Sequence, residues 1–528
     1  MRLSASNLVG IHALRGGVAL VVILVFSAVL AGPAYGHTGF ESSTPSDGQL
    51  LDAPVSDLTI TFSGLAEPAG DGFVIFDSSG DIRTPDSVTS DDDLTWRLGF
   101  DAPLTTGTIG VRWRVAAPDA HPIEGSFSFT VDTPAATITT AAVASNTEAL
   151  APTTTSSTLS AINPSEPFTD ETARAFEEFL DTDDSEAPLS GTLGVIGRIL
   201  TLLGAMIGLG GLVFGAAVLR GDPSDIRSVL FWTRRASVLL GVGVLIELLA
   251  QIASTGGTWA SFASPGAIES VVVSSFGAAV GLRLLGAIVL GFGARLDVRV
   301  ASASITPRAV IEEHAMVGAR PAGGGVLLKG RPERERDEDR PVDDGQVWQA
   351  ATGMVAFTGA ALVLASFLFD GHTASEGPRL VHALANVAHV GAGATWAGGV
   401  LMLAHVVSRR HRRGADLRAV ELAIRFSVIA AVALVVAGIA GTIVAVVILD
   451  SVSELWSTPW GRLLLAKVIA VGVAASAGAY NHKVLIPLMN RSEGDGSASQ
   501  HFRSVVRGEA IALIVVIALT AILVGAAS

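Results

Sequence analysis

Eight apolar stretches fill most of the chain after residue 190, and they constrain the fold more than any other feature. A helix that crosses a bilayer needs about 20 apolar residues, and its backbone polar groups must be satisfied within the membrane. We therefore predict an all-α polytopic bundle of eight transmembrane helices, the first three within 191–296 and the other five within 346–528. The stretches are 193–219, 229–253, 268–294, 347–369, 380–407, 419–449, 461–485 and 508–527.

Basic residues between these stretches indicate their direction. Loops on the cytoplasmic side of a membrane carry an excess of Lys and Arg. If the first span starts outside, every loop expected inside is basic and every loop expected outside is poor in basic residues. This pattern predicts that both ends of the bundle lie outside. The expected location is the plasma membrane, with the N-terminal domain on the extracytoplasmic side. The inside loops contain Arg220, Arg227, Arg234, Arg235, Arg295, Arg299, Arg308, the run RRHRR at 409–413, Lys483, Arg491, Arg503 and Arg507.

The first 36 residues have the pattern of a secretory signal peptide. Arg2 and Arg15 precede an apolar run, and Ala34 and Gly36 occupy the small-residue positions before a cut. Cleavage there makes His37 the N-terminus of the mature chain. Its α-amine and imidazole would then form a nitrogen chelate that suits copper(II).

Residues 37–132 alternate short β-prone stretches with Gly, Pro and Asp, which predicts an immunoglobulin-like β-sandwich. The expected strands are 58–62, 72–76, 94–100, 108–115 and 125–131. Residues 133–190 are expected to be a flexible linker with a short acidic helix, whose Phe176, Phe179 and Leu180 share one face. That face is expected to lie near the membrane or pack on the sandwich. The mixed-charge segment 297–345 is expected to be a disordered cytoplasmic loop.

Charge and composition exclude several kinds of site. From His37 to Ser190 there are 26 acidic residues against five Arg and no Lys. This negative charge disfavours nucleic acid as a binding partner. It is compatible either with a domain that attracts cations or with a solvated acidic surface that has no binding role. The chain has no cysteine, so a copper site must use nitrogen, oxygen or thioether ligands.

Asp119 and His121 lie two residues apart in the segment PDAHPIEG, ahead of the last expected strand. In extended backbone this spacing directs both side chains to one side. Together with His37 they would complete a tetragonal copper(II) plane. The alternative is that His121 is a loop histidine that binds no metal.

These residues also carry a resemblance. The segment SSTPSDG soon after His37, with DAHPIEGSFSFTV about 80 residues later, resembles the CopC family of extracytoplasmic copper-binding proteins. The resemblance implies that His37, Asp119 and His121 bind copper(II). Some members of the family also have a methionine-rich copper(I) site, which this methionine-free domain lacks.

The fifth apolar stretch carries the densest group of polar residues expected inside the membrane. His382, Asn386 and His389 fall on one helix face, and His372 precedes them in an outer loop. The two histidines are about 10 Å apart along a helix, too far to share one ion, so they would mark successive positions on a path. Interhelical hydrogen bonding and haem ligation are the alternatives. Met354 and Met402 are candidate copper(I) ligands.

Other ionisable residues are expected in the outer halves of the spans. Glu247 in the second span and Lys467 in the seventh have similar expected depth, which predicts a buried ion pair between them. Arg283 is expected midway along the third span.

The bundle also resembles a known family. HALANVAHVGAGATWAGG, WGRLLLAKVIAVGVAASAGAYNHKVLIPLM and FRSVVRGEAIALIVVIALTAILVG are similar to CopD copper-resistance membrane proteins, most closely from about residue 372 onward. CopC and CopD modules occur fused, and the fusions are associated with copper uptake. The resemblance implies a protein of copper homeostasis that captures copper(II) outside and moves it inward, with copper and the bilayer as its partners.

Two other functions remain open at this stage. One is a membrane-anchored copper store or sensor without transport. The other is an oxidative enzyme, because polysaccharide monooxygenases also bind copper through an N-terminal histidine; Asp119 would close the coordination position that oxygen needs. We expect no enzymatic activity, and no ATP hydrolysis because no nucleotide-binding loop is present.

Overall fold

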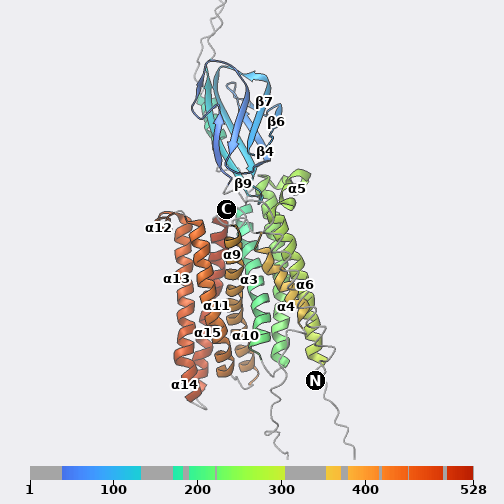
Figure 1. Cartoon of the computed structure of the whole chain (residues 1–528), viewed down its shortest axis with the longest axis vertical. Coiled ribbons are helices and arrows are strands. Elements are labelled where there is room, and N and C mark those ends of the chain that lie inside the picture. The colour runs from blue at the N-terminus through green and yellow to red at the C-terminus, as the bar shows by residue number, and fades with distance from the viewer. Residues whose placement is uncertain are drawn as a thin grey trace, which may run out of the picture.

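The computed structural model describes residues 38–132, 170–181, 189–219, 223–303, 353–369, 379–414, 419–449, 451–491 and 496–526. A β-sandwich stands on one end of a helical bundle, with its last strands next to the helices (Figure 1). The signal peptide predicted at 1–36, the linker predicted from 133 and most of the loop predicted at 297–345 lie outside the described residues.

The sandwich consists of two sheets. One has the strand order β1-β3-β7-β6 and the other β2-β9-β8-β4-β5. The five strands expected from sequence all occur, as β3, β4, β7, β8 and β9. The short strands β1, β2, β5 and β6 were missed because few residues show the alternation. The strands are β1 (Phe40–Thr44), β2 (Leu50–Leu51), β3 (Val55–Phe62), β4 (Glu67–Phe76), β5 (Ile82–Arg83), β6 (Ser87–Thr89), β7 (Thr95–Leu104), β8 (Gly107–Ala116) and β9 (Pro122–Val131).

Alternating side chains from both sheets form the core of the sandwich. Leu58, Ile60 and Phe62 of β3 are fully buried, as are Val111 and Val115 of β8. Each such side chain contributes roughly 1.5–3 kcal/mol when it leaves water. The core is built without disulfides, since the chain has no cysteine.

The acidic helix α2 (Asp170–Leu180) packs on the sandwich, the second of the two placements expected from sequence. Phe176 and Phe179 lie against Phe76 of β4, with ring centroids 5.6 and 5.4 Å apart. The guanidinium of Arg112 stacks over Phe179. Gly110 leaves room for both rings, because a Cβ there would lie 2.9 Å from Phe176.

The bundle follows at the end of the sandwich where β8 and β9 turn. Among the described residues, seven helices are long and apolar enough to cross a membrane. The helical elements are α3 (Ser190–Ala217), α4 (Pro223–Thr255), η1 (Trp259–Ala263), α5 (Pro265–Val273), α6 (Ser275–Ala303), α7 (Met354–Ser366), α9 (Arg379–Gly393), η2 (Ala394–Gly398), α10 (Gly399–Arg412), α11 (Ala419–Ile448), α12 (Glu454–Ser457), α13 (Pro459–Tyr480), η3 (Asn481–Leu485), α14 (Ile486–Arg491) and α15 (Gly496–Ala526).

The fourth expected span, 347–369, corresponds to the shorter helix α7. Its 13 residues extend about 20 Å, less than the roughly 30 Å of a bilayer core. Glycine contacts pair Gly286 with Val363 and Gly293 with Ala356, so α7 runs antiparallel to α6. The expected count of eight spans is therefore approximate: seven long helices and one short helix.

Small residues bring the first two helices of the bundle into close contact. A Cβ on Gly204 of α3 would lie 2.6 Å from the backbone nitrogen of Leu240, and a Cβ on Gly243 of α4 would lie 2.5 Å from that of Thr201. Such contacts let membrane helices associate through van der Waals packing. They fix α3 and α4 as one wall of the site described next.

Candidate copper site and intramembrane cavity

The turn between β8 and β9 carries Asp119 and His121. Antiparallel pairing continues to Ala116 and Pro122 at its base. Inside the turn, the backbone N–H of His121 donates to Oδ1 of Asp119 at 3.1 Å, which fixes the direction of the carboxylate. The extended geometry expected here is wrong: Ala120 between them has φ 64°, a left-handed conformation in which the chain reverses.

This turn is docked on the bundle. The carbonyl of Ala120 accepts hydrogen bonds from Thr255 Oγ1 at 2.7 Å and from Gln251 Nε2 at 2.9 Å, both on α4. Arg114 of β8 forms an ion pair with Glu124 and donates to the carbonyl of Ser254 at 3.1 Å. The turn is thereby held at the mouth of the bundle.

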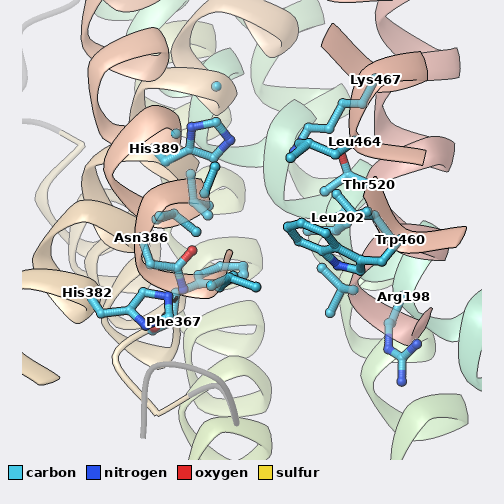
Figure 2. A pocket seen from close by; sticks show the side chains of 18 of the residues that line it. Arg198, Leu202, Phe367, His382, Asn386, His389, Trp460, Leu464, Lys467 and Thr520 are labelled. Atoms are coloured by element: carbon cyan, nitrogen blue, oxygen red, sulfur yellow. Dashed lines mark hydrogen bonds between the residues drawn. The ribbon is translucent and has the colours of Figure 1, made fainter. Parts of the chain in front are cut away.

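A cavity of about 1390 Å³ runs from this turn into the bundle. Asp119, His121, Glu124 and Thr38 of the sandwich line it together with His382, Asn386 and His389 of the bundle. Figure 2 shows the three α9 side chains on one wall, and Arg198, Trp460, Lys467 and Thr520 on the wall opposite. The cavity brings the residues predicted in the two domains to one continuous space.

The α9 wall holds its polar side chains in fixed positions. His389 Nδ1 lies 2.8 Å from the carbonyl of Ala437. A carbonyl only accepts, so Nδ1–H donates and Nε2 is the basic nitrogen. Asn386 Nδ2 donates to the carbonyl of Phe367 at 3.0 Å, and His382 is 1% exposed. The hydrogen bond from His389 Nδ1 to the Ala437 carbonyl is the arrangement by which proteins orient a histidine for a metal.

The ion pair predicted between Glu247 and Lys467 is wrong. Glu247 faces Arg283 of α6 instead, with 3.6 Å between Oε2 and Nη1. Arg283 also donates to Ser366 Oγ at 3.2 Å and lies over the ring of Phe367. Lys467 faces His389 across the cavity (Figure 2). Depth along a span does not indicate the helix face, and the face decides the partner.

Within the described part of the chain, no three His, Cys, Asp or Glu side chains lie close enough together to hold a metal ion. Asp119 and His121 therefore form an incomplete donor set by themselves. His37 and His372 lie outside the described residues. Thr38, which follows His37, is buried at the cavity, and its Oγ1 donates to the carbonyl of Leu65 at 2.8 Å.

The candidate thioether ligands are not placed on the cavity. Among the described lining residues neither Met354 nor Met402 occurs; Met402 is 3% exposed and packs in the bundle core. Met206 of α3 does line the cavity, and we did not select it from sequence. The signal that the sequence offers for Met206 is its place in a Gly-rich stretch of α3.

The pairing needed for haem is also absent from this wall. His405 forms a 2.8 Å hydrogen bond with Ser228 Oγ and packs edge-on against Trp232. His482 is exposed. Neither of them is among the described residues that line the cavity with His382 and His389.

Comparison with known proteins finds a family match in each of the two parts of the chain. The CopC domain model matches residues 40–132, and the model of copper resistance protein D matches residues 420–523. Copper resistance protein C of Xanthomonas campestris pv. juglandis is 30% identical over 120 residues, which are 22% of this chain and 94% of that protein. The protein of the same name from Pseudomonas syringae pv. tomato is 29% identical over 117 residues, 21% of this chain and 93% of that protein.

Two solved structures are similar to the sandwich. CopC from Methylosinus trichosporium OB3b has 28% identity over 19% of this chain and 96% of its own, with a TM-score of 0.17. PcoC, a methionine-rich copper resistance protein from Escherichia coli, has 25% identity over 18% of this chain and 98% of its own, with a TM-score of 0.16.

The class is thus a multi-pass membrane protein with a β-sandwich docked on its bundle, in families that handle copper. By its N-terminal domain the chain belongs to the CopC family, and with its CopD domain it is a CopC/CopD fusion protein.

Proposed function

We propose that this protein captures copper(II) outside the plasma membrane and transports copper inward through the bundle. One observation carries the proposal: the Asp119 and His121 side chains of the sandwich and the His389 side chain of the bundle line the same cavity. A capture site and a membrane path that share one space allow transfer without release of the metal to solvent.

The capture site combines His37, Asp119 and His121. After removal of residues 1–36, His37 supplies an amine and an imidazole, His121 a second imidazole and Asp119 a carboxylate, a set that suits tetragonal copper(II). The position of Thr38 on the cavity supports this set, because His37 precedes it directly. Docking of the turn on α4 keeps the local copper concentration high at the cavity mouth.

The path continues along α9. His389 presents Nε2 as its basic nitrogen, and His382 lies two turns away on the same face. About 10 Å of helix separates them, so each would bind copper in turn. His372 would lie above them. Met206 adds a thioether that favours copper(I).

Copper uptake tests two of the three alternatives, and the donor set argues against the third. A copper store or sensor would bind copper at the sandwich and not move it. An oxidative enzyme would need an open position on the copper, which Asp119 closes in the proposed set. Packing roles for His382 and His389 would leave transport unchanged when either is replaced.

The test is copper uptake into cells or vesicles that carry the full chain, measured by mass spectrometry. His389→Ala is expected to abolish uptake while copper(II) binding to the sandwich persists. His121→Ala is expected to weaken copper(II) binding at least tenfold, since even loss of an indirect partner typically costs about 10–100-fold in metal affinity.

His411→Ala is the matched control, because His411 is exposed at the end of α10 and is not among the described residues that line the cavity. Normal uptake by His389→Ala would remove His389 from the path. Tight copper(II) binding with no uptake by the unmodified chain would leave a store or sensor.

A further inference from the structure

A second polar group lies beyond the inner end of the cavity. Glu509 of α15 is 6% exposed although it sits within a membrane-spanning helix. It accepts a hydrogen bond from Asn481 Nδ2 at 3.3 Å, and the Trp396 side chain lies beside its carboxyl group. Ionisable groups at membrane depth are costly and are usually functional.

This group adjoins the cavity without belonging to it. Trp396 lines the cavity, as does Leu513, one turn after Glu509 on α15, whereas Glu509 and Asn481 are not among the described lining residues. Trp396 therefore lines the proposed copper path and also lies beside the carboxyl group of Glu509.

Both partners of Glu509 stand in wide helical turns. Trp396 lies in η2 and Asn481 begins η3, and both segments have π-helical geometry. Such turns insert one extra residue into a helix and occur frequently at functional sites. Gly478, one turn before Asn481, gives the carboxyl group room, because a Cβ there would lie 3.1 Å from Oε1.

The Asn481 amide suits both protonation states of the carboxyl group. Its Nδ2 donates to the carboxylate, while its Oδ1 is buried without a hydrogen-bond partner. Rotation of the amide would offer Oδ1 to a protonated Glu509, and no hydrogen bond to Oδ1 would be lost. A buried acceptor without a partner is unfavourable, and a protonated Glu509 would give Asn481 Oδ1 a hydrogen-bond partner.

No basic group in the described residues forms an ion pair with Glu509. On α10, His405 bonds to Ser228, and Arg409 and Arg410 bond to Asp225; on α15, Arg507 donates to Ser408 and Arg503 lies six residues away. Other charged residues of the packed elements are distant or exposed. Arg198 lies beside Gly525, Lys467 lies 14 residues before Asn481, and Glu421 is paired with Arg425. The exposed ones are His411, Arg412, Arg413, Arg462, His482, Lys483 and His501.

We propose that Glu509, held by Asn481 and Trp396, binds a proton that is exchanged for copper during transport. A cation that reaches the Trp396 end of the cavity favours the carboxylate, so Glu509 releases its proton, and the proton moves opposite to the copper. Rebinding of a proton after the copper has left resets the site. The inference rests on the transport function proposed above.

The test uses the full-length protein in vesicles that contain a pH-sensitive dye, with copper added outside. For the unmodified chain, copper entry is expected to raise the internal pH as protons leave, and an acidic interior is expected to accelerate entry. Glu509→Gln is expected to abolish the change in internal pH and to lower the rate of copper uptake about tenfold. Copper(II) binding to the sandwich is expected to be retained. Glu509→Asp is expected to restore part of both.

Glu269→Gln, which removes an exposed carboxyl group on α5, is the control and is expected to behave as the unmodified chain. Copper entry without proton exit in the unmodified chain would overturn proton exchange and leave transport standing, whether or not the variants fold. An unchanged proton signal in Glu509→Gln would overturn the role of Glu509. Absence of copper entry in the unmodified chain would overturn the transport function and this inference with it.

Discussion

At the scale of single residues, the orientation of His389 depends on a glycine in the neighbouring helix. Gly441 of α11 faces the imidazole, and a Cβ there would lie 2.8 Å from two of its ring atoms. The carbonyl of Ala437, one turn earlier, holds Nδ1. Together they decide where Nε2 points in the cavity.

Gly441→Ala is therefore expected to displace the His389 ring and lower copper uptake about tenfold, equivalent to about 1.4 kcal/mol. Gly438→Ala is the matched control, because Gly438 also lines the cavity but a Cβ there meets no atom within 4 Å. Equal uptake rates for the two variants would contradict a role for the orientation of His389.

The sequence placed His382, Asn386 and His389 on one helix face, and all three line the cavity. It could not place Arg283 opposite Glu247, because that contact depends on how α4 and α6 rotate about their own axes. Glu509 was also missed: the contact with Trp396 and Asn481 joins residues from three separate elements.

At the scale of elements, α2 shows how an apolar stripe on an acidic helix finds its partner. Phe179 is buried against β4, and Ser126 of β9 donates to the carbonyl of Leu180 at 2.7 Å. The core of the sandwich is complete without this helix. The helix α2 can therefore detach from the sandwich and rebind while the sandwich stays folded.

Phe179→Ala is expected to weaken this docking by about 2 kcal/mol, the value of burying one such side chain, without unfolding the sandwich. Hydrogen exchange should then increase in 170–181 and remain slow in β3 and β8. Glu177→Ala serves as control, since Glu177 is exposed on the same helix. Equal exchange in both variants would contradict the docking.

At the scale of the whole molecule, the sandwich and the bundle act together only because the β8–β9 turn is fixed at the cavity mouth. Ala120, Ile252 and Val271 form a small buried cluster between the two parts. Beside it, the Ala120 carbonyl accepts the two hydrogen bonds from Gln251 and Thr255.

Replacing both donors, by Gln251→Leu with Thr255→Val, removes two hydrogen bonds worth about 2 kcal/mol together. Copper(II) binding to the sandwich is expected to stay unchanged, while uptake falls severalfold because the capture site is no longer held over the cavity. Ser270→Ala on α5, whose hydroxyl bonds only within its own helix, is the control. Unimpaired uptake in the double variant would show that docking is not needed for transfer.

The sequence by itself determined the sandwich, the apolar helices and the polar stripe on α9, because alternation, hydropathy and helical spacing are local properties of a chain. Only the tertiary structure decided that the β8–β9 turn rests on α4, that Arg283 rather than Lys467 faces Glu247, and that one cavity joins the two domains. Those contacts depend on how helices rotate and how closely glycines let them approach, and both follow from the packing of distant segments.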